Sequence, residues 1–244
     1  TSIMCTTGLP SMLDTLARNY NNRNPEAWLY EISSEYLPRE GEDLPEEKAV
    51  LMVGCYGGEA DFFTLKGTVE SLLSRLNLPR ADYTAVSTHP SYHPGRFAVL
   101  TVGDVEIGSV GEVHPTVLEN FGIGCRAWIA RLDIARLFAV RLPEATYHAL
   151  PRFPASTRDL AVICDESLPV AAIEKTITGA VGNILEQIKL FDVYRGAPVP
   201  AGKKSVAYSL VLRAADRTLT VEECDKAIEK ALKALSQYGI TLRA

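Results

Sequence analysis

The sequence predicts an α+β fold in two domains, each built as an antiparallel sheet with helices packed against it. Within the last hundred residues, strand-like and helical patterns follow one another in the order β-α-β-β-α-β. The residues before them alternate short apolar runs, turn residues and helical patterns, without an internal repeat. The chain has 244 residues and a hydrophobic fraction of 47%, which is enough for two ordinary cores.

The first part of the chain opens with a predicted helix at residues 10–21, where apolar side chains recur at helical spacing. Asparagines and Pro25 end this helix, and apolar runs predict strands at residues 28–37 and 49–56. Helical spacing returns at residues 62–76. The remaining predicted elements are a strand at 83–87, a hairpin of strands 97–102 and 105–110, a helix at 115–121, a strand at 127–132 and a helix at 134–139.

The last hundred residues follow a predicted linker at residues 142–150. Their predicted elements are a strand at 158–165, a helix at 169–179, strands at 184–194 and 205–213, a helix from residue 220 and a strand at 240–243. Ser167 is the expected cap of the first helix. Thr220 and Glu223 have the spacing of a capping box, and Gly239 ends the second helix. This order is the split βαβ plan of ferredoxin-like domains, which by itself names no function.

The net charge of −5 is unevenly spread along the chain. Residues 1–147 hold 12 Lys and Arg against 19 Asp and Glu, a net charge of −7, whereas residues 148–244 hold 13 against 11, a net charge of +2. The acidity of the first part argues against polyanion binding by that part alone. The second part is only mildly basic, so we expect any RNA contact to use local patches and not a global positive field.

Cysteine usage and hydropathy indicate a cytosolic protein. The five cysteines are far apart, odd in number and without a C-x-x-C pair, which favours reduced thiols over a disulfide framework or a zinc site. No apolar run approaches the roughly 20 residues of a membrane span, and no signal segment opens the chain. Because the first residue is Thr1 and not Met, we expect a piece of a longer chain.

Several ordered blocks in the last hundred residues resemble one family. They are Phe153-Pro154, Arg158-Asp159-Leu160-Ala161, Phe191-Asp192-Val193-Tyr194, the block at residues 204–210 and Arg217-Thr218-Leu219-Thr220. Together they resemble the ferredoxin-fold anticodon-binding domain that closes the β subunit of bacterial phenylalanyl-tRNA synthetases. Blocks in the first part are similar to the class II synthetase-like domain that precedes it in the same subunit. They are Arg18-Asn19, Leu29-Tyr30-Glu31-Ile32, the block at residues 61–67, His93-Pro94-Gly95-Arg96 and Gly111-Glu112-Val113-His114-Pro115.

The resemblance implies a partial, non-catalytic class II synthetase-like domain at residues 1–147 and an anticodon-binding domain at residues 150–244. It implies a cytoplasmic protein that scaffolds the catalytic α subunit of an α2β2 heterotetramer and contacts the anticodon region of phenylalanine tRNA. The whole resembled enzyme attaches phenylalanine to that tRNA with ATP and magnesium. We expect this chain to hold no cofactor or metal of its own and to bind neither DNA nor membranes.

Two substitutions predict that the first part is not catalytic. Class II synthetases hold the ATP α-phosphate with an arginine in an Arg-x-Glu motif, because a guanidinium neutralises the charge that develops during adenylation. If Glu31 is that glutamate, Leu29 stands in place of the arginine. In a Gly-rich segment similar to the third motif, Cys125 replaces the acidic residue before Arg126.

RNA recognition favours unpaired bases, which stack on aromatic side chains and are held by nearby cations. A βαββαβ sheet leaves one face free of helices, so cations and aromatics of the last domain are the candidates. The predicted RNA-binding residues are Arg152, Phe153, Arg158, Tyr194, Arg195, Lys203, Lys204 and Arg213, with Lys189 and Arg217 as further candidates. The competing interpretation is that the aromatics are core residues and the domain is a protein-interaction module without RNA.

Other possible sites have simpler structural interpretations. His89 and His93 have an H-x3-H spacing, but Pro90 and Pro94 argue against a shared helix face and therefore against a metal site. Cys164 lies in a predicted strand and is expected to be a packing residue. We expect the glycines at 54, 57 and 58 to form turns, and the acids at 61, 70 and 112 to lie on a solvated face.

Overall fold

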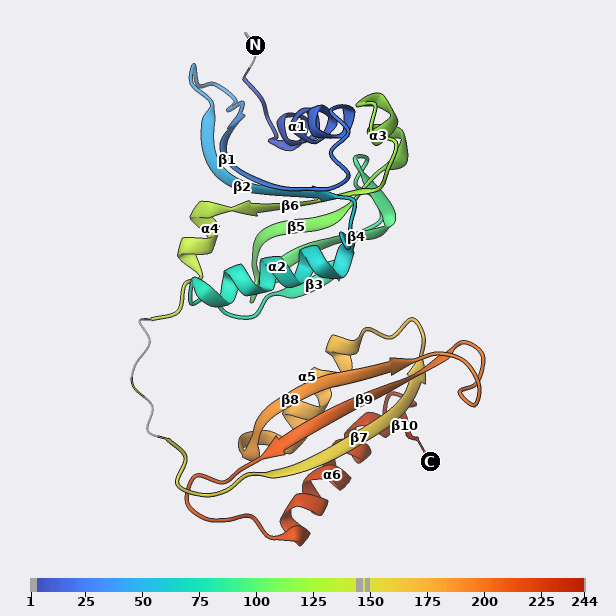
Figure 1. Cartoon of the computed structure of the whole chain (residues 1–244). Coiled ribbons are helices and arrows are strands. Elements are labelled where there is room, and N and C mark those ends of the chain that lie inside the picture. Colours follow the sequence, from blue (N-terminus) through green and yellow to red (C-terminus); the bar gives the residue numbers. More distant parts are fainter. Residues whose placement is uncertain (1–3, 144–146, 148–149, 244) are drawn as a thin grey trace. The chain divides into compact units, whose positions relative to one another are not determined.

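The computed structural model describes residues 4–143, 147 and 150–243 (Figure 1). The chain divides into two compact units, Thr1–Thr146 and Tyr147–Ala244. The sequence had predicted domains at 1–147 and 150–244. Each unit is a layered α+β domain with its own antiparallel sheet, in agreement with the predicted fold class.

The first unit contains a six-stranded sheet in the order β1-β2-β6-β5-β4-β3, with every neighbouring pair antiparallel. Its elements are α1 (Leu9–Asn21), β1 (Ala27–Leu37), β2 (Glu46–Tyr56), α2 (Phe62–Arg75), β3 (Asp82–Ala85), β4 (Tyr92–Val102), β5 (Val105–Val113), α3 (Pro115–Asn120), β6 (Ala127–Asp133) and α4 (Ile134–Ala139). All of the predicted elements of this part are present.

Strand β4 is longer than predicted, because it begins at Tyr92 and not at residue 97. The pairing of β4 with β5 shifts register between Tyr92 and Phe97. Pro94 and Gly95 lie in this irregular stretch, where proline cannot donate to the ladder.

Both faces of this sheet carry a core. On one face, α1 packs Met12, Leu13 and Leu16 against β2, β4 and β6. On the other face, α2 packs Leu65, Val69 and Leu73 against β5 and β6. The helices are well delimited locally, since Asp61 and Thr64 form a reciprocal capping box at the start of α2.

A buried ion pair ties the start of the chain to this sheet. Glu35 is only 3% exposed, and its side chain accepts a hydrogen bond from Arg131 Nε at 2.9 Å and another from the backbone N–H of Gly8 at 3.1 Å. Gly8 is the N-cap of α1 and has no side chain to cap the helix. Glu35 of β1 therefore joins the beginning of α1 to β6 across the sheet.

The second unit has the predicted order of elements. They are β7 (Ser156–Asp165), α5 (Val170–Val181), a 3-10 turn η1 (Gly182–Ile184), β8 (Leu185–Tyr194), β9 (Lys203–Leu212), α6 (Val221–Ser236) and β10 (Thr241–Leu242). The sheet order is β10-β7-β9-β8. The predicted Ser167 cap is wrong, because Pro169 occupies the N-cap of α5 and no side chain caps this helix.

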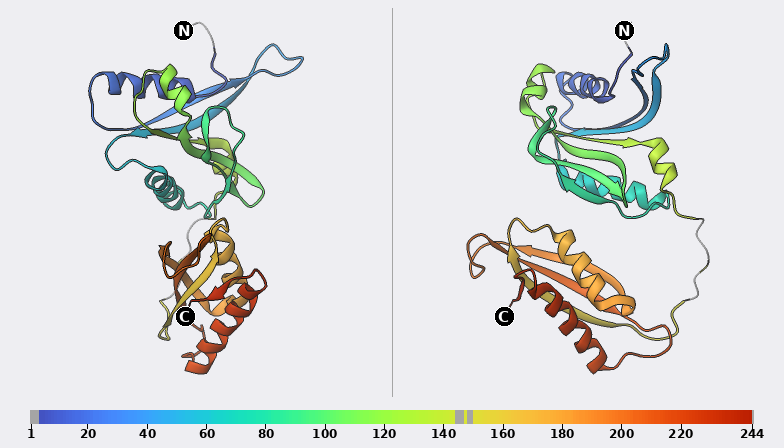
Figure 2. Two further views of the ribbon diagram at one scale, coloured as in Figure 1. Left: turned by 90° about the vertical axis from the view of Figure 1, so that its right-hand side faces the viewer. Right: turned by 180° about the vertical axis from the view of Figure 1, so that it is seen from behind.

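Helices α5 and α6 lie together on one face of this sheet (Figures 1 and 2). The core between them and the sheet contains Leu160 and Val162 of β7 and Val206, Tyr208 and Leu210 of β9. Because side chains alternate along a strand, the intervening positions point to the opposite face. Among the described residues of this unit, no helix covers that face, which we call the open face.

A capping box fixes the start of α6, and its contribution to stability can be measured. Thr220 Oγ1 accepts from Glu223 N at 3.3 Å, and Glu223 Oε2 accepts from Thr220 N at 2.9 Å. We expect Thr220→Ala to lower the free energy of unfolding of this domain by about 1 kcal/mol, because the backbone N–H of Glu223 loses its side-chain acceptor. Urea denaturation followed by circular dichroism measures this, with Thr218→Ala as the exposed neighbouring control. Equal midpoints for the two variants would contradict the role of the box.

Candidate nucleic-acid interface

The open face carries one group of side chains that suits a nucleic-acid base. Ser205 in the central strand β9 lies opposite Ile163 on one side and opposite Tyr194 on the other. Tyr194 is 39% exposed, and its Oη donates to the carbonyl of Ala197 at 2.7 Å. The ring is therefore fixed at its tip while part of its surface faces solvent.

Arg243 completes this group from the C-terminal end of the chain. Its backbone N–H donates to the carbonyl of Ala161 at 2.9 Å, which extends the β10–β7 pairing by one residue. Its guanidinium carbon lies 5.7 Å from the centroid of the Tyr194 ring, and its Nη1 donates to Ser205 Oγ at 3.2 Å. Tyr194, Ser205 and Arg243 thus form a preorganised aromatic and cationic group, which we call the tyrosine platform.

Two members of the tyrosine platform, Ser205 and Arg243, were missed by the sequence analysis. Ser205 could have been found from the alternation of β9, where Val206 and Tyr208 point to the core and Ser205 must point away. Arg243 gave no such signal, because its approach to Tyr194 depends on where the short strand β10 pairs. Asp192, also exposed and two residues before Tyr194, adds an acceptor to the same strand.

The other predicted RNA-binding residues do not form one cluster. Lys203 lies on the same face as Ser205, and its Nζ lies 2.7 Å from Asp165 Oδ1. Arg195, in the turn after β8, has its Nε 3.0 Å from Glu166 Oε1. Both cations lie at the end of the sheet where β8 ends and β9 begins, which is also the end that carries the tyrosine platform. Each of them has an acidic partner.

The remaining candidates lie at other places in this domain. Arg213 has its Nε 2.7 Å from Glu186 Oε2 and donates to the carbonyl of half-buried Phe153, at the opposite end of β9. Arg158 reaches towards α6, where its Nε lies 3.4 Å from Asp225 Oδ1, and therefore belongs to the helical face. Arg152 is exposed ahead of β7, Lys189 is exposed on β8, and Arg217 is bonded to Asp216 and Glu223.

Lys204 is a poor candidate for RNA contact. It is only 6% exposed and points to the helical side, opposite to Lys203. Its Nζ donates to the carbonyl oxygens of Glu166 at 2.9 Å and Leu168 at 2.6 Å. The ammonium group therefore closes the loop before α5, and we assign it a structural role in place of the predicted phosphate contact.

In the first unit, the residues considered for catalysis or metal binding make packing contacts or close turns. Leu29 packs partly buried against the core beneath α1, and Glu31 accepts a hydrogen bond from Ser11 Oγ at 3.3 Å. Burial raises the pKa of the Cys125 thiol. His89 Nδ1 accepts from Ser91 N and His93 Nδ1 accepts from Gly95 N, each closing a local turn.

One predicted surface acid is buried. Glu112 is 2% exposed and is bonded by Arg96 and Arg126, with Arg96 Nη1 at 3.0 Å from Glu112 Oε2. Burial would raise the pKa of this carboxyl, but the hydrogen bonds and charges of the two arginines outweigh burial and lower it. The expectation that Glu112 lies on a solvated face is wrong. Its role is to hold β4, β5 and the start of β6 together.

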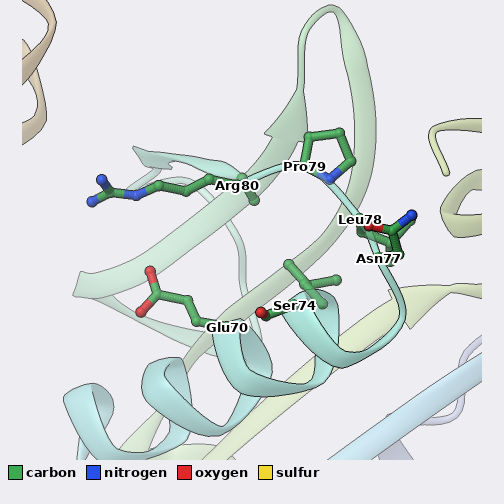
Figure 3. A pocket seen from close by; sticks show the side chains of 8 residues that line it. Glu70, Ser74, Asn77, Leu78, Pro79 and Arg80 are labelled. Atoms are coloured by element: carbon green, nitrogen blue, oxygen red, sulfur yellow. The ribbon is translucent and has the colours of Figure 1, made fainter. Parts of the chain in front are cut away.

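Among the described residues of the first unit, one surface hollow lies beside α2. The hollow in Figure 3 encloses about 380 Å³ between the C-terminal half of α2 and the loop to β3. Glu70 and Arg80 project from its two sides, and apolar atoms of Leu78 and Pro79 complete it. Within the part of the chain that the structure describes, no three His, Cys, Asp or Glu side chains are grouped as metal ligands.

Comparisons with known proteins agree with the two-domain architecture. Residues 1–134 match the model of the phenylalanyl tRNA synthetase beta chain CLM domain, and residues 151–243 match that of the ferredoxin-fold anticodon binding domain.

Across its described residues the chain has no helix of the length and hydropathy that a membrane crossing requires. The solved structure of PylSc, a pyrrolysyl tRNA synthetase of Desulfitobacterium hafniense, covers 56% of this chain and 49% of its own, with a TM-score of 0.47 and 14% identity.

Curated relatives cover almost the whole chain. The phenylalanine–tRNA ligase beta subunit of Clostridium tetani is 45% identical over 244 residues, which is 99% of this chain and 31% of the relative. That of Clostridium acetobutylicum is 43% identical with the same coverage, and that of Bacillus subtilis is 35% identical over 96% of this chain and 31% of the relative. The chain thus spans 31% of the length of these relatives. It belongs to the phenylalanyl-tRNA synthetase beta-chain family and comprises a CLM domain followed by a ferredoxin-fold anticodon-binding domain.

Proposed function

We propose that the second domain binds the anticodon loop of phenylalanine tRNA through the tyrosine platform, while the first domain scaffolds the catalytic alpha subunit of the ligase. The support for the assignment to a ligase is the family and the name of the relatives. In this proposal the whole ligase attaches phenylalanine to its tRNA in the cytoplasm with ATP and magnesium. This chain contributes binding and assembly, with no cofactor of its own.

The observation that carries the RNA assignment is the tyrosine platform on a helix-free sheet face. RNA loops present unpaired bases, which proteins bind by stacking on an aromatic ring and by hydrogen bonds to the base edge. Tyr194 supplies the exposed ring and Arg243 a cation fixed beside it, while Ser205, only 1% exposed, accepts a hydrogen bond from Arg243 and holds that cation in place. The bond from Tyr194 Oη to Ala197 fixes the ring before RNA arrives, which lowers the entropy cost of binding.

The electrostatics of this domain predict weak binding by the isolated chain. Its net charge is only +2, and Lys203 and Arg195 each have an acidic partner. Few phosphate contacts release few counterions, so the affinity should fall with salt along a shallow slope. A complete ligase would add further tRNA contacts on the same molecule and raise the overall affinity by effective concentration.

One feature of the first domain supports the proposal that catalysis lies in the alpha subunit. Adenylation needs a fixed cation on the ATP α-phosphate. If Glu31 is the glutamate of the Arg-x-Glu motif, Leu29 stands in place of its arginine, and Leu29 is packed against the core beneath α1. A leucine in this position cannot neutralise phosphate charge, so we propose that the first domain keeps the synthetase-like sheet for assembly and not for chemistry.

Replacing Tyr194 tests the platform. We expect Tyr194→Ala to weaken binding of the phenylalanine tRNA anticodon stem-loop by roughly 1–3 kcal/mol, because a base loses its stacking partner. Tyr194→Phe is the matched control, since it keeps the ring and removes only the bond to Ala197, and it should lose much less. Binding is measured by fluorescence anisotropy with the whole chain at low salt. Equal affinities for the alanine and phenylalanine variants would rule out stacking at this position.

A further inference from the structure

A buried carboxylate in the first domain holds two arginines. Glu112 of β5 is 2% exposed, and each of its carboxylate oxygens accepts hydrogen bonds from both Arg96 of β4 and Arg126, which precedes β6. Glu35 in the same domain is 3% exposed and is held by a single arginine, Arg131, and a backbone N–H. The second arginine of Glu112 therefore exceeds what burial of a carboxylate requires in this domain.

The surplus positive charge of this group faces solvent. The side chains of Arg96 and Arg126 are 47% and 57% exposed, whereas that of Glu112 is 3% exposed. Among the described residues, no acceptor is found for Nε and Nη2 of Arg96 or for Nη1 of Arg126. Guanidinium groups bind phosphate oxygens through paired hydrogen bonds, so two of them fixed on one carboxylate suit a phosphate group.

Trp128 adds an unsatisfied donor to the same group. It lies opposite Glu112 in the β5–β6 ladder and two residues after Arg126, so the three side chains share one face of the sheet. The Arg126 guanidinium carbon lies 5.1 Å from the centroid of the Trp128 ring. Trp128 is 5% exposed, and its buried Nε1 has no acceptor among the described residues. Because buried donors are nearly always bonded in folded proteins, this N–H indicates a place for an acceptor from a ligand.

We propose that Arg96, Arg126 and Trp128 form a binding site for a small ligand that carries a phosphate group. The two guanidiniums bind the phosphate oxygens, Glu112 holds the guanidiniums in place, and the oxygens lie beside the indole N–H. This site is independent of the proposed RNA binding, because the tyrosine platform belongs to the second domain.

The charge around the site favours a ligand with few phosphates over RNA. The net charge of −7 over residues 1–147 repels a long polyanion, whereas the two arginines attract an anion at short range. Asp61 also lies near the site, since hydrogen bonding with Thr64 and, to a smaller extent, the charge of Arg126 lower the pKa of Asp61. This carboxylate is engaged as the N-cap of α2, where its Oδ1 accepts from Thr64 N at 2.6 Å.

The indole N–H of Trp128 provides the readout for a test. The chain has two tryptophans, so its proton–nitrogen correlation spectrum contains two indole cross-peaks, and Trp28→Phe assigns them. The whole chain is titrated with inorganic phosphate and with pyrophosphate, while sodium chloride keeps the ionic strength constant. We expect the Trp128 cross-peak to move progressively and to saturate, while the Trp28 cross-peak stays in place.

Removal of either arginine should weaken binding. Arg96→Gln and Arg126→Gln should each raise the Kd for pyrophosphate by about tenfold or more, because charged hydrogen bonds to the anion are lost. Each variant leaves Glu112 one arginine partner. Arg39→Gln is the matched control, since the Arg39 side chain is also 47% exposed and pairs with the exposed Glu42, and its Kd should not change. The dispersion of the spectrum verifies that each variant remains folded.

Four outcomes would overturn the proposal. The Trp128 cross-peak moves with neither anion, or it moves as far when sodium chloride alone is added, or both arginine variants bind pyrophosphate as tightly as Arg39→Gln. The fourth is that a short RNA duplex moves the cross-peak and pyrophosphate does not, which would reject a site for a small ligand. If one arginine variant does not fold, the other variant and the titration of the unmodified chain decide the question.

Discussion

Replacing Glu35 by alanine is expected to lower the free energy of unfolding of the first domain by about 3–5 kcal/mol. The variant leaves the half-buried guanidinium of Arg131 without its carboxylate and the N–H of Gly8 without its acceptor. Breaking a buried ion pair from one side costs more than the pair itself contributes, because an uncompensated charge remains in a poorly hydrated place. We therefore expect Glu35 to dominate the stability of the α1–β1–β6 region.

Tryptophan fluorescence during urea denaturation measures this effect. Both tryptophans, Trp28 and Trp128, belong to the first domain, so their emission follows that domain alone. Glu31→Ala is the control on the same strand, since the hydrogen bond of Glu31 with Ser11 is exposed, and it should shift stability by about 0.5 kcal/mol or less. A loss below about 1 kcal/mol in Glu35→Ala would show that water replaces the ion pair easily.

Replacing Lys204 by glutamate is expected to unfold the second domain. The carboxylate would be buried facing the carbonyl oxygens of Glu166 and Leu168, which now accept from the ammonium group. Burial of an unpaired charge costs several kcal/mol, which is a large share of the stability of a domain of this size. Lys203→Glu is the matched control, since the neighbouring side chain is more exposed and points to the open face.

Circular dichroism and thermal denaturation separate the two lysine variants. Lys203→Glu should keep a cooperative transition and weaken RNA binding if this side chain meets a phosphate. Lys204→Glu should lose the transition of the second domain while that of the first domain persists. If Lys204→Glu folds normally and loses only RNA affinity, then the bonds to Glu166 and Leu168 are dispensable and Lys204 is an RNA contact after all.

The pair of lysines shows how far the sequence could predict the site. Lys203 and Lys204 look equivalent in a list of cations, but neighbouring residues of a strand point to opposite faces. The buried pattern at Val206 and Tyr208 already assigns Lys204 to the core side. Combining the charge pattern with the strand alternation would have removed Lys204 and suggested Ser205, because both depend only on local order along β9.

The position of Arg243 could not be predicted from local sequence patterns. Its place beside Tyr194 depends on β10 pairing with β7 and on β8 lying beyond β9, which are relations between segments far apart in the chain. The order of elements was predictable, because apolar periodicity and caps such as Thr220 and Glu223 are local signals. Contacts such as the one from Glu35 to Arg131 are set by the sheet register, which single-sequence patterns do not determine.

The most direct test of the central claim is a competition for the second domain between two RNA loops. The whole chain is titrated with the anticodon stem-loop of phenylalanine tRNA at several salt concentrations, and the same stem-loop with an altered anticodon is the competitor. We predict that the phenylalanine loop binds more tightly, that its affinity falls as salt rises, and that Tyr194→Ala removes most of the difference between the loops. Equal binding of both loops, or no binding at low salt, would contradict the anticodon role and leave a ferredoxin-like protein-interaction module without RNA binding in its place.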